Sequence, residues 1–199
     1  MFNAGFKMKI SHIAGARETI QKVTQHEVGH YIAARIFGFK TGDLSLELTD
    51  LAGAHNGGAV IELVRSLDNI EKIKNYIEER IIILYAGVLS ENMNNGTIDQ
   101  EAANESLKTT GANDFAKVRE LLNLLNSILY TDEKDAQKEL EKINDNLWGK
   151  ALKLVEQESK LIEGVASKFA SFIKETHTKY ILSEKDLEKI PNLQKRFSD

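Results

Sequence analysis

Residues 24–30 read Thr-Gln-His-Glu-Val-Gly-His, and this stretch decides both the local fold and the chemistry that the chain offers. Side chains four residues apart lie on one face of a helix, so His26 and His30 can direct two imidazoles towards one metal ion. Glu27 stands beside them and can handle a proton. The pattern H-E-x-x-H on a helix is typical of zinc sites that combine two ligands with a general base.

Apolar residues at helical spacing surround the motif and predict a helix over residues 17–37, followed by Gly38 as a stop. These residues are Ile20, Val23, Val28, Tyr31, Ile32 and Ile36. Unpaired polar groups are costly to bury in such surroundings, and a bound metal accounts for two histidines and a glutamate there. The alternative is a surface helix whose histidines fall four apart by coincidence. The apolar surroundings favour the metal site.

The composition favours a single domain over residues 1–199, large enough for its own core and predominantly helical. Lysine and arginine number 26 against 30 aspartates and glutamates, which gives a net charge of −4. This mild acidity, with basic residues scattered among acids, argues against nucleic acid as a partner. The chain has no cysteine, so a zinc ion would have to be held by nitrogen and oxygen atoms.

No targeting or membrane segment is expected. The first ten residues lack the continuous apolar core of a signal peptide. The longest apolar run, residues 81–88, is far shorter than the roughly 20 residues that span a bilayer. We therefore expect a cytoplasmic protein without a membrane span.

The segment after the first helix has the pattern of a small β element. Leu44, Leu46 and Leu48 alternate with polar residues, which is the period of a half-buried strand. Residues 50–56 are expected to form a loop, and residues 57–63 a second strand. Two strands in close succession indicate a hairpin or the edge of a short sheet.

The rest of the chain is predicted to be helical. One long helix begins at the N-cap Asp68 and ends near Asn92, and residues 94–96 form a turn. Shorter helices are expected over residues 101–107 and after Gly111. Beyond residue 131 we expect a C-terminal helical bundle whose inward side chains are Leu140, Ile143, Leu147, Leu154, Leu161, Val165, Phe169 and Phe172. A last helix over residues 182–190 is capped by Ser183. The fold class is therefore mainly α (α+β).

A catalytic zinc ion normally takes three protein ligands, and the motif supplies two. The third ligand must come from His12, His55, His177 or a carboxylate further along the chain. Asp114 stands near the start of a predicted helix, where the helix dipole favours a carboxylate and where it could also be a simple N-cap. Glu91 is the second candidate, as a ligand or as a support for a histidine.

Three stretches, taken together, resemble the peptidase domain of the FtsH-type ATP-dependent zinc metalloproteases. They are His-Glu-Val-Gly-His at 26–30, Tyr-Ala-Gly-Val-Leu-Ser-Glu at 85–91 and Thr-Gly-Ala-Asn-Asp at 110–114, which are similar to the family's H-E-A-G-H, G-G-R-x-A-E-E and T-G-A-x-N-D. The resemblance implies that His26, His30 and Asp114 bind Zn²⁺ and that Glu27 is the catalytic base. It also implies that an extended substrate lies along the strand at 57–63.

The sequence departs from this family in two respects. Val88 replaces the arginine of the second motif, and Glu91 is followed by Asn92 where the family has paired glutamates. These 199 residues also contain neither a G-x-x-x-x-G-K-[ST] phosphate loop nor a membrane anchor. The resemblance implies a hexameric homo-oligomer. We expect either that the protein cuts flexible or unfolded segments by itself or that a separate chain supplies an ATPase as a partner.

We therefore expect a zinc-dependent metalloendopeptidase that hydrolyses flexible or unfolded polypeptides through a zinc-activated water. The alternative is a non-catalytic peptide-binding or regulatory protein that keeps the same fold, and a metal-free helical protein is the third reading. The remaining histidines, His12, His55 and His177, are expected at the surface, with His55 in a solvated loop. Trp148 is expected in the core.

Overall fold

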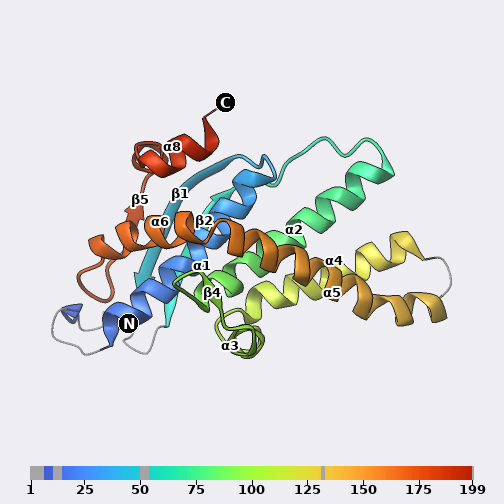
Figure 1. Ribbon diagram of the computed structural model, residues 1–199, viewed down its shortest axis with the longest axis horizontal. Coiled ribbons are helices and arrows are strands. Elements are labelled where there is room, and N and C mark those ends of the chain that lie inside the picture. Colours follow the sequence, from blue (N-terminus) through green and yellow to red (C-terminus); the bar gives the residue numbers. More distant parts are fainter. Residues whose placement is uncertain (1–6, 11–14, 50–53, 131–132, 199) are drawn as a thin grey trace, which may run out of the picture.

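The computed structural model describes residues 7–10, 15–49, 54–130 and 133–198, and it is mainly helical with a small antiparallel sheet (Figure 1). The helices are α1 (Ala16–Ile36), α2 (Ile70–Glu91), α3 (Gln100–Ser106), α4 (Ala112–Leu129), α5 (Glu133–Gln157), α6 (Ser159–Phe172), α7 (Glu184–Leu187) and α8 (Pro191–Phe197). The strands are β1 (Thr41–Leu48), β2 (His55–Ile61), β3 (Met93–Asn94), β4 (Thr97–Ile98) and β5 (Tyr180–Leu182).

Helix α1 is the centre of the fold, and its predicted position is confirmed. It packs against α2, α6 and the sheet, and its residues from Val23 to Ala34 are buried. Helices α1 and α2 approach closely at Gly29, where a Cβ atom would lie 2.5 Å from the carbonyl oxygen of Ala86. A side chain at residue 29 would therefore separate the two helices that carry most of the candidate site.

The main sheet has three strands in the order β2-β1-β5, all antiparallel. Leu44, Leu46 and Leu48 of β1 are buried, as their alternation predicts. The expectation of a two-stranded element is corrected by β5, because Leu182 pairs with Leu44 instead of beginning a helix. The helix after it is shorter than predicted, although Ser183 is its N-cap.

The hairpin between β1 and β2 is tighter than the sequence indicates. The strand pairing reaches Leu48 and His55, and beyond them the backbone N–H of Thr49 donates to the carbonyl of Ala54. The prediction of a loop over residues 50–56 is therefore wrong for residues 55 and 56, while residues 50–53 lie outside the described residues. Strand β2 also ends at Ile61, two residues before its predicted end.

Helix α2 begins one residue later than predicted, because the side chain of Asn69 accepts the hydrogen bond of the N-cap. Asp68 instead forms an ion pair with Lys72. At the other end, β3 and β4 form a small hairpin whose turn residues Asn95 and Gly96 both have positive φ. The predicted turn at 94–96 is thus confirmed.

The C-terminal helices form two separate elements, α5 and α6, which pack against α2 and α1. Leu147, Val165 and Phe169 are buried as predicted. Phe172 is 46% exposed, contrary to the prediction, because it is the last residue of α6. Trp148 packs on the core with its indole ring edge-on to the ring of Tyr85.

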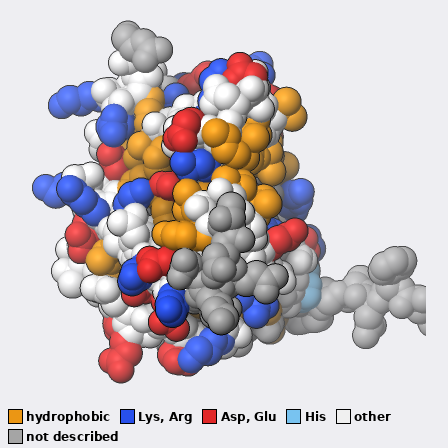
Figure 2. Space-filling model, turned by 90° about the vertical axis from the view of Figure 1, so that its right-hand side faces the viewer, with side chains coloured by type: hydrophobic (Ala, Val, Ile, Leu, Met, Phe, Trp, Pro, Cys, Tyr) orange, Lys and Arg blue, Asp and Glu red, His pale blue; other side chains and the backbone are white. Residues whose placement is uncertain are grey.

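The segment between β2 and α2 leaves apolar side chains exposed. Arg65 attaches this segment to the rest of the fold through an ion pair with Glu79 of α2 and by stacking over the ring of Phe39. The exposed residues on either side are Val60, Leu63, Val64, Leu67 and Ile70. Figure 2 views the molecule from the end at which α2 begins and shows hydrophobic side chains grouped on that face. None of the described helices is long and apolar enough to cross a membrane.

Candidate metal centre

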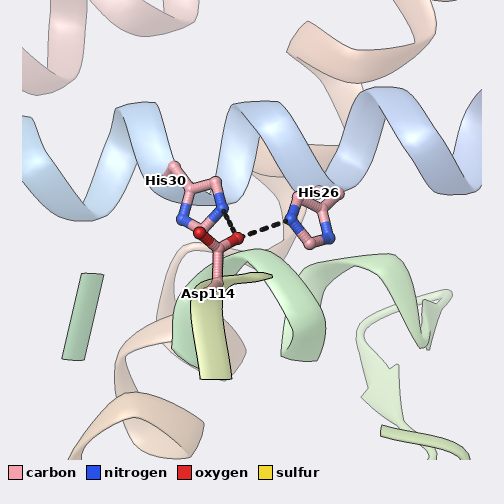
Figure 3. A group of neighbouring side chains, drawn as sticks. All are labelled: His26, His30 and Asp114. Atoms are coloured by element: carbon pink, nitrogen blue, oxygen red, sulfur yellow. Dashed lines mark hydrogen bonds and ion pairs between the residues drawn. The ribbon is translucent and has the colours of Figure 1, made fainter. Parts of the chain in front are cut away.

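His26, His30 and Asp114 come together although they lie far apart in the sequence (Figure 3). The two histidines project from α1, and Asp114 stands in the first turn of α4. The Oδ2 atom of Asp114 lies 3.3 Å from His26 Nε2 and 3.0 Å from His30 Nε2. Both imidazoles are buried, with exposed fractions of 5% and 8%. One nitrogen from each histidine and one carboxylate oxygen therefore converge on a single point.

Helix α2 orients both imidazole rings through their Nδ1 atoms, whereas their Nε2 atoms face Asp114. His30 Nδ1 lies 2.8 Å from the carbonyl oxygen of Ile83, and His26 Nδ1 lies 2.9 Å from Glu91 Oε2. Thr110 in turn donates a hydrogen bond of 3.0 Å to the same oxygen of Glu91. Because both partners are acceptors, each Nδ1 carries a hydrogen, so each Nε2 presents a lone pair whenever its ring is neutral.

This donor set fits a metal ion. With neutral imidazoles, the two Nε2 atoms and Asp114 Oδ2 are three electron-pair donors facing one another without a proton between them, and a cation relieves that repulsion. All three atoms lie within 4.8 Å of one another. Ligand atoms of a tetrahedral zinc ion lie roughly 3.3 Å apart, given metal–ligand distances of about 2.0–2.2 Å. The group can therefore hold a metal ion, and nitrogen and oxygen ligands are acceptable to zinc.

The absence of a side chain at Gly87 gives the imidazoles their room. A Cβ atom there would lie 3.0 Å from His26 Nε2 and would overlap the Cε1 and Nε2 atoms of His30. Gly87 is buried inside α2, about one turn before its end, where alanine would otherwise favour the helix. The glycine is explained by the space that the two rings occupy.

The cluster also concentrates charge. Burial works against a charged His26, but its hydrogen bonds with Asp114 and Glu91 and the charge of Glu27 raise its pKa to about 10. Burial likewise opposes ionisation of Asp114, but contacts with the two histidines and with Lys117 hold its pKa well below the usual range. Without a metal, a protonated His26 is thus paired with an ionised Asp114.

Metal binding is expected to release protons, because the raised pKa of His26 keeps it protonated at neutral pH. Asp114 is already ionised and contributes none. His26 must lose its proton before Nε2 can act as a ligand, so the apparent zinc affinity should rise by about tenfold per pH unit between pH 6 and 8. Calorimetry of zinc binding in buffers of different ionisation enthalpy should give about one proton released per zinc ion.

A His26→Ala variant provides the control for this titration, since it lacks the group that must lose the proton. Its weaker zinc binding should depend less on pH than that of the wild type. An enthalpy of binding that is identical in all buffers for the wild type would contradict the prediction.

Glu27 lies one residue after the first histidine and is also buried, with an exposed fraction of 6%. It is outside the ligand cluster, and its Oε1 atom points to the strand β2, where a Cβ atom on Gly57 would lie only 2.8 Å away. The acidic group of the H-E-x-x-H motif therefore stands between the metal cluster and an edge strand.

The other histidines are not part of the cluster. His55 belongs to β2 and is half-buried, so its placement in a solvated loop is wrong. His177 is half-buried with a φ of 52°, and His12 lies outside the described residues. Sequence reasoning missed the Ile83 carbonyl, Gly87 and Lys117. Only Lys117 had a signal, because it follows Asp114 by three residues on α4, within reach of an ion pair.

No protein-family model and no curated protein matches this chain. The functional argument therefore depends on the motifs and on the geometry of the cluster.

Proposed function

We propose that this protein is a zinc-dependent metalloendopeptidase that cuts flexible or unfolded polypeptides. One observation carries the proposal: the Nε2 atoms of His26 and His30 and the Oδ2 atom of Asp114 converge, and Glu27 stands beside them, buried and outside the ligand set. Three nitrogen or oxygen ligands with an adjacent carboxylate are typical of hydrolytic zinc sites. A metal site that serves only for structure has no need of a buried fourth acid.

The residues of the chain would divide the work of peptide hydrolysis. Zinc, when bound by His26, His30 and Asp114, supplies Lewis acidity that polarises a carbonyl and makes water more acidic. Glu27 would accept the proton of the attacking water and pass it to the leaving amine. Glu91 and the Ile83 carbonyl would hold the two imidazoles in the required tautomer.

The strand β2 offers a place for the substrate. Among the described strands it pairs only with β1, so over residues 56–61 its other edge presents backbone N–H and C=O groups. An extended peptide could add to this edge by backbone hydrogen bonds, which tolerate many side chains. Such pairing requires an extended substrate, and this is why we propose flexible or unfolded polypeptides.

We also infer membership of the FtsH-type peptidases from the motifs at 26–30 and 110–114, whose histidines and aspartate are the three residues of the cluster. By analogy with that family, the active form would be a homo-oligomeric ring and an ATPase partner would unfold its substrates. Analytical ultracentrifugation of the purified protein tests the first of these two inferences.

A second candidate function is peptide binding without cleavage. Val88, which stands where the family has arginine, is fully buried and packs against Gly111 at the start of α4. This position therefore serves packing, and any role of the family's arginine in activity is missing here. In a pure binding protein the strand β2 would hold a peptide and Glu27 would have no proton to move.

The proposal is tested by incubating the zinc-loaded protein with unfolded casein and with a quenched fluorescent peptide. Cleavage should require zinc, stop on addition of a chelator, and return when zinc is restored, because the metal supplies the Lewis acid. A tightly folded protein offered as substrate should stay intact. Mass spectrometry should show about one zinc ion per chain.

His30→Ala should lose both zinc and activity in this assay, since it removes a ligand. His177→Asn is the matched control: it changes a histidine outside the cluster and keeps a residue type that tolerates positive φ. A wild-type protein that holds one zinc ion per chain and yet cleaves neither substrate would contradict the peptidase and favour the binding protein.

A further inference from the structure

Gly57 lies where the strand β2 meets the acidic residue of the metal motif. It pairs with Leu46 of β1 on the face of the sheet that packs against α1. A Cβ atom on Gly57 would lie 2.8 Å from Glu27 Oε1, 2.9 Å from Leu46 Cδ1 and 3.2 Å from the carbonyl oxygen of Ser45. The space that a side chain at residue 57 would need is thus already occupied by the Glu27 carboxylate and by Leu46.

Backbone conformation does not account for this glycine. The glycines with positive φ in the described residues are Gly15, Gly38 and Gly96. Gly57 therefore adopts a conformation open to any residue, in a strand interior where glycine is unfavourable. Its neighbour Gly58 is different, because a Cβ atom there would meet nothing within 4 Å. Space beside Glu27 is the property that distinguishes Gly57.

We propose that Gly57 is a positioning residue, which sets the place of the Glu27 carboxylate between the metal cluster and the edge of β2. This inference rests on the proposed peptidase function. A methyl group at residue 57 would push the carboxylate away, since a glutamate tip moves more easily than the backbone of β1. The ligands His26, His30 and Asp114 do not touch this strand position and would stay in place.

The geometry also predicts which residue of a bound peptide would be cut. Because Glu27 contacts β2 at Gly57, the peptide bond that is cut would belong to the substrate residue lying beside this position. A displaced carboxylate would still allow the peptide to pair with β2, since the backbone groups of the strand are unchanged. The step that suffers is proton transfer, and a misplacement of about 1 Å can cost roughly 100-fold in rate.

The test compares Gly57→Ala with Gly58→Ala, two identical substitutions at neighbouring positions of one strand. Gly57→Ala should lower kcat by roughly 10- to 100-fold, with KM and zinc content unchanged. Gly58→Ala should stay within about twofold of the wild type in both constants. The thermal midpoint of Gly58→Ala should equal or exceed that of the wild type, because alanine suits a strand at least as well as glycine. Gly57→Ala should remain folded with a somewhat lower midpoint, because its methyl group also meets Leu46 and the Ser45 carbonyl.

A spectroscopic readout keeps this test separate from that of the proposed function. The ¹³Cδ resonance of Glu27, assigned through Glu27→Gln, should move in Gly57→Ala and stay in place in Gly58→Ala. If the wild type cleaves nothing while the resonance moves as expected, the peptidase fails and the positioning role stands. An unmoved resonance, an unchanged kcat, or a kcat lost together with zinc in Gly57→Ala would overturn the role of Gly57.

Discussion

Gly87→Ala is expected to weaken zinc binding strongly although residue 87 supplies no ligand. The added methyl group would overlap the His30 ring and press on His26 Nε2, so the two imidazoles could not keep their present positions. We expect the zinc affinity to fall by roughly 100-fold or more, as when the groups that orient metal ligands are lost. Competition with a chromogenic chelator measures this change directly.

The helix itself should tolerate the substitution, since alanine favours a helix interior over glycine by about 0.5–1 kcal/mol. Gly149→Ala is the matched control, because it lies in α5 and a Cβ atom there meets nothing within 4 Å. This control should bind zinc normally. Normal zinc affinity in Gly87→Ala, with circular dichroism like that of the wild type, would show that the rings are free to move and that the explanation of this glycine is wrong.

Glu27→Gln is expected to remove peptidase activity and leave the zinc content unchanged. Glutamine has nearly the shape of glutamate but cannot accept a proton from the attacking water, so kcat should fall by about 10²- to 10⁴-fold. The zinc ligands are the two histidines and Asp114, and none of them is altered. The rate is measured with the quenched peptide, and zinc is measured on the same samples by mass spectrometry.

Glu18→Gln serves as the control, since Glu18 lies on α1 as well but is exposed and paired with Lys22. It should cleave at the wild-type rate. Full activity of Glu27→Gln would exclude Glu27 as the base. If neither the wild type nor Glu27→Gln cuts a peptide that both bind equally well, the chain is a binding protein.

The helix with the metal motif was predictable from sequence because its determinants are local. The spacing of Val23, Val28 and Ile32 fixes the helix and its buried face, and His26 and His30 then share that face by geometry alone. Asp114 is different, since helical spacing cannot relate residues of α1 and α4. Its place beside the histidines was expected from the resemblance of residues 110–114 to a family motif.

The parts of the site that the sequence did not predict depend on tertiary approach. The role of Gly87 becomes visible only when α1 packs against α2, because in the sequence it is one small residue in an apolar helix. The backbone carbonyl of Ile83 has no sequence signal at all. The third strand escaped prediction for a related reason. Residues 180–182 are too few to show alternation, and they form β5 only because β1 offers an edge for pairing.

The pairing of Leu44 with Leu182 joins two segments that lie 138 residues apart in the sequence, since 182 − 44 = 138. During synthesis on the ribosome, α1 and the β1–β2 hairpin emerge early, but the hairpin acquires its third strand only after residue 182 has left the exit tunnel. Contacts between such distant segments form slowly. A nascent chain would therefore carry its metal motif well before the sheet behind α1 is complete.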